Sequence, residues 1–178
     1  MKQRVKQIFI MSVFFLGMKT SAMATSVALD GLWLDEDNIK TAIVQNDNKV
    51  ILNNKSGSTV VKMNGTVSGK TITVSVDQTK LTGEISDDNL VITWKNGSKW
   101  FRDISGTWAN EKGNNLLIEQ IGSFVRVKNE KGDVQSVGFL KDEGIVLIAK
   151  TTNETTAGSL QEENGIVWKN GTAWRKKM

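Results

Sequence analysis

The stretch WKNGSKW at residues 94–100 returns as WKNGTAW at residues 168–174. In both stretches Asn-Gly stands between short arms that alternate apolar and polar residues, and this is the strongest short-range signal for a β-hairpin. The chain has 178 residues, and a segment written twice in it predicts two copies of one structural unit.

The duplication extends to the start of each copy. Leu29-Asp30-Gly31-Leu32-Trp33 aligns with Ile104-Ser105-Gly106-Thr107-Trp108, and all six tryptophans of the protein fall at matching places, three in each copy. We therefore expect two repeat domains, at residues 25–102 and 103–178. Only Asp103 separates Arg102, at the end of the first copy, from Ile104, where the matched segment of the second copy begins, so we also expect the copies to pack closely.

Each copy reads as short strands separated by Gly, Asn and Asp turns. Residues 71–76, for example, alternate polar and apolar side chains as a strand with one wet face does. We expect second-copy strands near residues 105–109, 116–120, 124–128, 134–140, 145–150, 155–161, 166–169 and 172–176. The first copy gives eight matching segments. The predicted fold class is therefore all-β, with two tandem antiparallel up-and-down barrels of about eight short strands each, because closure removes exposed sheet edges.

The loop of the hairpin decides where the tryptophans point. A two-residue Asn96-Gly97 loop would send Trp94 and Trp100 to opposite faces of the sheet. A three-residue loop that ends in Gly97 at positive φ pairs Ile92 with Trp100 and puts both indole rings on one face. Because the first geometry leaves a large ring in water, we expect the second.

The second copy agrees, since a three-residue loop ending in Gly171 brings Trp168 and Trp174 to one face. Three tryptophans in so small a unit favour a filled interior, in which each buried ring contributes about 3 kcal/mol or more. The functional alternative is that the rings contact a ligand, with Trp100 and Trp174 at a mouth where they stack on an apolar molecule or a sugar. The candidate ligand-binding residues are therefore Trp94, Trp100, Trp168 and Trp174.

The opening of each copy, Gly31-Leu32-Trp33 and Gly106-Thr107-Trp108, combines Gly-x-Trp with a basic residue on the last strand. This combination resembles the calycin group, which comprises the lipocalins and avidins. The resemblance implies an up-and-down barrel that is closed at one end and binds a small ligand at the other. Each copy is much shorter than the barrels of those families, so a wide ligand cup is not implied.

The resemblance also implies structural roles at the closed end of each barrel. In calycins the first-strand tryptophan packs beneath an arginine from the last strand. Carried over, Trp33 would meet Arg102, and Trp108 would meet Lys176 by register or Arg175 by chemistry. Lysine lacks the planar guanidinium that stacks on a ring, so the second copy departs from the calycin pattern.

The composition excludes much of enzyme chemistry. The chain has no histidine and no cysteine, which removes histidine general bases, cysteine nucleophiles and the usual zinc ligands. Neighbouring acids at residues 87–88 and 162–163 lie in turns, where they point apart instead of facing each other as in a glycosidase. A calcium loop at residues 35–38 is not repeated at residues 110–113. We expect no catalytic residue, no metal site, no cofactor and no enzymatic activity.

The first 24 residues have the pattern of a signal peptide, with a basic start, an apolar run at residues 8–18 and Ala22-Met23-Ala24 as the cleavage site. No later apolar stretch is long enough for a membrane anchor. A cysteine-free exported chain suits a bacterial periplasm or the surrounding medium. We therefore expect an exported protein, periplasmic or extracellular, from a bacterium.

Export also removes the apparent basicity. The full chain has 23 basic and 19 acidic residues, and four of the basic ones lie in the first 24 positions. Without them 19 basic residues balance 19 acidic ones, so a basic face for nucleic acid loses its support. The sequence predicts a non-enzymatic, calycin-like binding protein for an unknown small apolar molecule or partner. The alternatives are a tandem carbohydrate-binding module and a secreted effector or inhibitor that acts through its surface.

Overall fold

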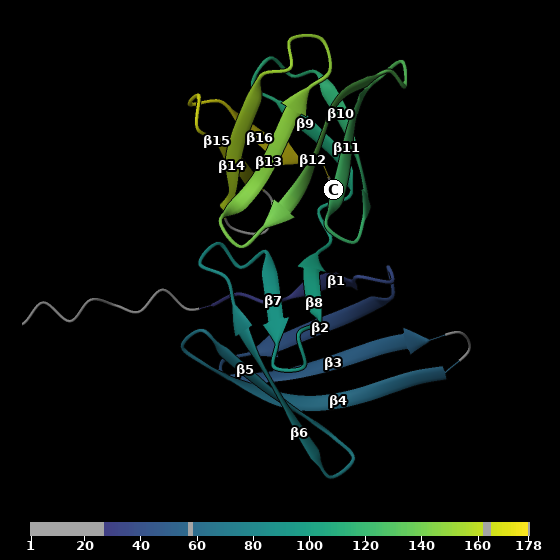
Figure 1. Cartoon of the computed structure of the whole chain (residues 1–178), viewed down its shortest axis with the longest axis vertical. Helices are drawn as coiled ribbons and strands as arrows, with labels where there is room; N and C mark the ends of the chain where they lie inside the picture. Colours follow the sequence, from purple (N-terminus) through teal and green to yellow (C-terminus); the bar gives the residue numbers. More distant parts are fainter. Residues whose placement is uncertain (1–26, 57–58, 162–164, 178) are drawn as a thin grey trace, which may run out of the picture.

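The computed structural model describes residues 27–56, 59–161 and 165–177, and this part of the chain contains sixteen β-strands and no helix. The strands form two closed antiparallel barrels in tandem, which confirms the predicted fold class (Figure 1). Among these residues there is consequently no helix that could cross a membrane. The expected signal peptide and the acidic pair at residues 162–163 lie outside the described residues.

The first barrel is an up-and-down meander in which each strand pairs with the next and the eighth returns to the first. Trp33 stands opposite Arg102 across the closing pair. Its strands are β1 (Gly31–Asp35), β2 (Lys40–Asn46), β3 (Lys49–Ser56), β4 (Thr59–Ser68), β5 (Thr71–Val76), β6 (Thr79–Ile85), β7 (Val91–Trp94) and β8 (Lys99–Arg102).

The second barrel repeats this order, and the closing pair sets Trp108 opposite Lys176. Every strand expected in this copy is present, with bounds that differ by one residue at most. They are β9 (Gly106–Asn110), β10 (Asn115–Ile121), β11 (Phe124–Asn129), β12 (Val134–Lys141), β13 (Gly144–Ala149), β14 (Thr155–Gln161), β15 (Gly165–Trp168) and β16 (Ala173–Lys176).

The hairpins that join the last two strands of each barrel have the expected three-residue loop. Ile92 pairs with Trp100, and Ile166 pairs with Trp174. The loop glycine has a φ of 90° in the first barrel and 85° in the second, a backbone conformation that residues other than glycine rarely adopt. Both tryptophans of each hairpin therefore lie on one face, as the sequence predicts.

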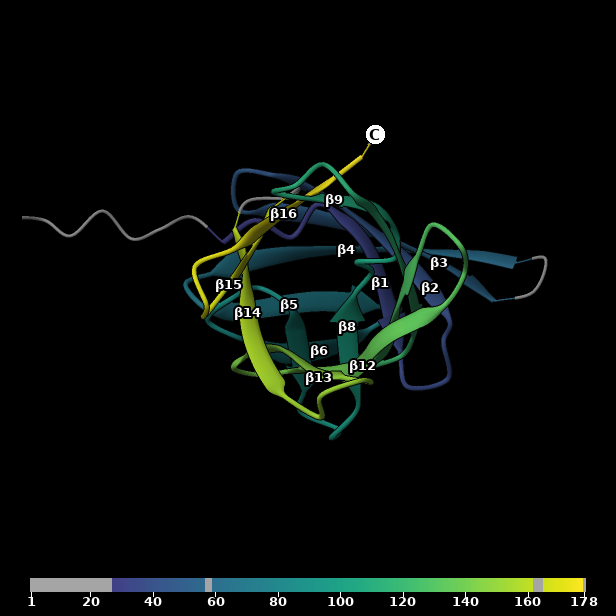
Figure 2. The same cartoon turned by 90° about the horizontal axis from the view of Figure 1, so that it is seen from above.

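The barrels pack against each other as expected from the short link between them. One end of the second barrel rests on the outer wall of the first at β7 and β8, and the second barrel overlies the first when viewed from above (Figures 1 and 2). Val91 and Phe101 point outward from the first barrel, yet they are only 1% and 7% exposed because they join the apolar cluster of the second. An ion pair between Lys99 and Asp142, at 3.1 Å, borders this contact.

Candidate functional site

The closed end of the first barrel has the arrangement that the calycin resemblance implies. Trp33 is fully buried and its Nε1–H donates to the Leu29 carbonyl at 3.0 Å. The Arg102 guanidinium lies 5.4 Å from the centroid of the Trp33 ring and donates to the carbonyls of Ala28 and Asp30. Arg102 therefore joins the first and last strands through both a cation–π contact and hydrogen bonds.

The closed end of the second barrel uses lysine in place of arginine. Trp108 is fully buried and donates to the Ile104 carbonyl at 2.9 Å. The Lys176 ammonium lies 5.9 Å from the centroid of its ring, whereas Arg175 is exposed on the outer face. Of the two alternatives left by the sequence, the register decides for Lys176. Burial lowers the pKa of Lys176, the nearby charge of Asp103 partly opposes this, and the charge of Arg102 lowers the pKa further.

A glutamine clamp fixes the chain at both closed ends, and the sequence analysis missed it. Gln45 accepts a hydrogen bond from the Leu29 N–H at 2.8 Å and donates to the Val27 carbonyl at 2.8 Å. Gln120 makes the same two bonds with the residues 75 positions further on, at 2.8 and 3.0 Å. The shift of 75 that aligns the opening tryptophans also aligns these glutamines, so the repeat carried the signal for them.

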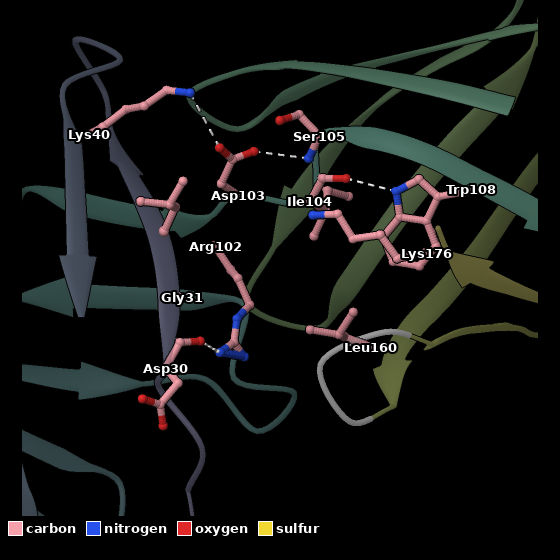
Figure 3. Close-up of a pocket in the computed structure, with 11 residues that line it drawn as sticks. Asp30, Gly31, Lys40, Arg102, Asp103, Ile104, Ser105, Trp108, Leu160 and Lys176 are labelled. Atoms are coloured by element: carbon pink, nitrogen blue, oxygen red, sulfur yellow. Dashed lines mark hydrogen bonds and ion pairs between the residues drawn. The ribbon is translucent and has the colours of Figure 1, made fainter. Parts of the chain in front are cut away.

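A cavity of about 380 Å³ lies at the junction of the two barrels and is lined by residues from the closed end of each (Figure 3). Its wall on one side comes from the closed end of the first barrel, with Arg102, and on the other from that of the second, with Lys176. The three-residue link 103–105 runs along it. The cavity is therefore a feature of the tandem arrangement and would not exist in either barrel alone.

The charge in this junction cavity is mostly positive. Asp103 has a side chain that is only 6% exposed, pairs with the Lys40 ammonium at 3.6 Å and accepts a hydrogen bond from the Ser105 N–H at 2.9 Å. Figure 3 shows the Asp30 carboxylate pointing away from Arg102, and that carboxylate accepts the Gln45 backbone N–H. The cavity thus brings together three cationic side chains and one inward carboxylate.

The four predicted ligand-binding tryptophans lie in the two barrel interiors. Trp94 and Trp168 are buried, while Trp100 and Trp174 are partly buried and pack against the two apolar clusters. The rings of each hairpin meet edge to face, with centroids 4.9 Å apart in the first barrel and 4.7 Å apart in the second. All four rings have the packing expected of core residues, and their contact with a ligand stays a prediction.

An apolar row crosses the outside of the second barrel, and the sequence analysis did not identify it. Its members are direct cross-strand neighbours from β10 to β14. Ile121 is 65% exposed and Phe139 is 45% exposed. Phe124 contacts Phe139 edge to face, with ring centroids 5.5 Å apart. We call this set the outer row: Ile121, Phe124, Phe139, Val146 and Ala157.

The same positions of the first barrel are polar. At the outer row the cross-strand pairs from β2 to β6 correspond to those from β10 to β14, although β11–β12 has a register shift after Val127 that β3–β4 lacks. The outer positions beside the row carry both apolar and polar side chains in each barrel. The apolar cross-strand pair there is Val44 with Ile51 in the first barrel and Val137 with Ile148 in the second. The residues that correspond to the outer row are Asn46, Lys49, Thr66, Thr73 and Thr82.

The acidic turns have structural partners. The Asp35 carboxylate accepts the Ile39 N–H at 2.7 Å, and Asn38, with a φ of 63°, completes that turn. Asp87 is fully exposed, while Asp88 is half-buried and accepts a hydrogen bond from the Ser86 hydroxyl at 2.7 Å. Within the described ranges no group of three or more acidic side chains is placed to hold a metal ion.

Comparison of this chain with protein families, with curated proteins and with solved structures finds no match. A comparison within the molecule, between its own two barrels, is more informative. The closed ends, the glutamine clamps and the hairpin tryptophans recur in both, whereas the outer row and the cation over the first tryptophan differ.

Proposed function

We propose that this chain is an exported, non-enzymatic binding protein whose second barrel holds a partner protein against the outer row. One observation carries the proposal. Five neighbouring outer positions of the second barrel are apolar, two of them exposed and three partly exposed, while the equivalent positions of the first barrel are polar. Two copies of one scaffold thus share their interior and differ in what they present to their surroundings.

The fold itself does not require these apolar side chains. The first barrel closes with the same strand order although Lys49 and Thr66 occupy the places of Phe124 and Phe139. Burying one large apolar side chain contributes about 1.5 to 3 kcal/mol, so covering the row offers a substantial gain to a complex. Contiguous exposed apolar patches of this kind mark interaction sites.

Filled interiors direct binding to the outside. In the first barrel a Cβ added to Gly83 would lie 3.0 Å from Trp94, and in the second a Cβ on Gly158 would lie 2.6 Å from Trp168. Gly83 and Gly158 are the cross-strand partners of these rings, so each indole packs directly against the backbone of the neighbouring strand. The buried apolar side chains inside each barrel join one cluster with that ring, which fills the interior. A small apolar ligand inside the barrels is therefore less well supported than a partner on the surface.

We further propose that each barrel is a small relative of the calycins. The support comes from the closed ends, where Arg102 covers Trp33 and Lys176 covers Trp108. A secreted effector or inhibitor would also use the outer row, because it too would hold its target protein against the surface of the barrel.

The test transplants the polar row of the first barrel onto the second. The variant Phe124→Lys, Phe139→Thr, Val146→Thr takes its residues from positions where this scaffold already carries them. Nile red, an uncharged probe of exposed apolar surface, should brighten with the natural chain and much less with the variant. Affinity capture from the natural secretion environment should recover a partner with the natural chain alone.

The matched control changes the equivalent first-barrel positions to other polar residues, for example Thr66→Ser with Thr73→Ser, and should alter neither readout. The unfolding midpoint of the transplanted variant shows whether it remains folded. Equal Nile red binding or equal partner recovery by the folded variant would overturn the proposal. Concentration-dependent dimers that the transplant abolishes would replace the partner protein with a second copy of the chain.

The carbohydrate alternative has one observation in its favour, because each barrel keeps a partly buried indole, Trp100 or Trp174, beside its hairpin loop. A sugar would have to stack on the part of the ring that its edge-to-face partner leaves open. The double variant Trp100→Phe, Trp174→Phe tests this on a glycan array. A glycan signal that disappears in the folded variant would support the alternative, and a signal that persists would exclude these rings.

A further inference from the structure

We propose that the junction cavity is a binding site for a small anion that carries a carboxylate or phosphate group, with Lys176 as its main contact and Lys40 at its rim. This site is independent of the outer row. It lies between the closed ends of the two barrels, and the cationic side chains that line it come from both (Figure 3).

The first support is the charge balance. Three cations, Arg102, Lys40 and Lys176, line the cavity with two aspartates. The Asp30 carboxylate points away from Arg102 and accepts the Gln45 N–H, which leaves Asp103 as the aspartate paired with a lining cation (Figure 3). One oxygen of the Asp103 carboxylate pairs with the Lys40 ammonium at 3.6 Å, and the other accepts the Ser105 N–H at 2.9 Å. An arriving anion would therefore meet an excess of positive charge in a partly desolvated space, where charge interactions are stronger than in water.

The second support is the state of the Lys176 ammonium. Among the described residues it has no hydrogen bond and no ion pair, and its contacts are the Trp108 ring at 5.9 Å and the more distant charges of Asp103 and Arg102. A half-buried ammonium keeps three donors that favour an acceptor. Burial lowers the pKa of Lys176 because the charged form is short of compensation there, and a bound anion would supply it.

The third support is the contrast with the first barrel. There the equivalent cation is Arg102, and its guanidinium donates hydrogen bonds to the backbone carbonyls of Ala28 and Asp30. Lys176 occupies the same place over Trp108 but forms no such bonds. Arginine closes its barrel end by itself, whereas lysine leaves donors directed at the cavity.

The backbone leaves room for this lysine. Gly106 has a φ of 121°, and a Cβ built on it would lie 3.4 Å from the Lys176 Cε. The glycine thus lets the lysine stem pass close to the first strand and reach the cavity. The volume of about 380 Å³ falls within the range of small-molecule pockets, roughly 300 to 1,000 Å³, so a phosphate or a short dicarboxylate fits.

The experiment measures the affinity of the full chain for inorganic phosphate and for succinate by calorimetry, with the total tryptophan emission, to which Trp108 contributes, as a second readout. Lys176→Met keeps an unbranched side chain that is one atom shorter and removes the charge, and it should weaken binding about tenfold. The matched control is Arg175→Met, one residue earlier on the same strand but exposed on the outer face, and it should leave the affinity unchanged.

A second variant, Asp103→Asn, should change the anion affinity in the opposite direction. Asp103→Asn removes the competing carboxylate, keeps an acceptor for the Ser105 N–H and should tighten binding roughly two- to fivefold. Should Lys176→Met fail to fold, Asp103→Asn and Lys40→Met carry the test, with Lys40→Met expected to weaken binding. Preference for phosphate or succinate identifies the anionic group. Absence of binding, or equal affinity in the natural chain and folded Lys176→Met, would overturn the proposal.

Discussion

The side-chain amide of Gln120 donates to the backbone carbonyl of Arg102 across 3.0 Å, so a strand of the second barrel clamps the residue that ends the first. The same amide donates to Gly122, and its oxygen accepts the Ile104 N–H. One side chain therefore fixes both the start of the second barrel and its orientation on the first.

Gln120→Ala should reduce the free energy of unfolding by about 1 to 3 kcal/mol, because it leaves the partly buried Ile104 N–H and Arg102 carbonyl without their partner. Urea unfolding followed by tryptophan emission measures the change. Gln135→Ala is the control, since Gln135 is exposed and its side-chain amide donates only to the Asp133 carbonyl, at 3.3 Å. Equal, small losses in both variants would show that the clamp adds no stability.

Gly158→Ala should destabilise the chain by about 1 to 3 kcal/mol, since the new methyl group would lie 2.6 Å from the Trp168 Cε3. The loss should shrink when Trp168 is also changed to Phe, because the smaller ring makes room. Denaturation of the two single variants and the double variant gives this coupling directly. Strictly additive losses would mean that the glycine and the ring do not compete for space.

Phe101→Asp should separate the unfolding of the two barrels. Phe101 points outward from β8 and is buried only by the second barrel, so a carboxylate there must either lose its charge or part the barrels. Scanning calorimetry should show one transition for the natural chain and two for Phe101→Asp. Val44→Asp, at an exposed outer position of the same barrel, should keep a single transition. One unchanged transition in Phe101→Asp would contradict a cooperative junction.

Asp88 predicts a pH dependence of stability with a defined sign. Burial is the largest effect on this carboxyl and raises its pKa above 3.8, while bonds from Ser86 and Leu90 partly oppose it. The folded state therefore takes up a proton more readily than the unfolded chain, so this group adds stability as the pH falls through its folded pKa towards 3.8.

The measurement compares Asp88→Asn with the natural chain by thermal unfolding from neutral to acidic pH. As the pH falls through the acidic range, the unfolding temperature of the natural chain should rise relative to that of Asp88→Asn. Glu119, whose pKa is lowered by its bond to Lys128, acts with the opposite sign in both proteins and cancels in the difference. A gap that stays constant with pH would show that Asp88 titrates as it does in the unfolded chain.

The parts of the fold that the sequence predicted depend on local rules. Side chains alternate between the two faces of any strand, so β5 could be read from residues 71–76 alone. Glycine at positive φ determined the hairpin loops, and the loop length then determined the register that pairs Ile92 with Trp100. Repetition made both inferences stronger, because each had to hold twice.

The candidate sites could not be predicted in the same way. Phe124 and Val146 are far apart in the sequence, and only the strand register places them on either side of Phe139. Burial of Phe101 depends on how one barrel rests on the other, which no pattern along a strand encodes. The choice of Lys176 over Arg175 needed the closing pair of strands, because both are basic and adjacent.

By itself, then, the sequence determined that this chain is all-β, that it is duplicated and that its hairpin tryptophans point inward. These properties follow from side-chain alternation and turn geometry, which act over a few residues. Tertiary structure alone decided the clamp between Gln120 and Arg102, the charged cavity at the junction and the continuity of the outer row. Each of these brings together residues whose distance is set by strand register and by the packing of two bodies, and such distances are not local properties of a chain.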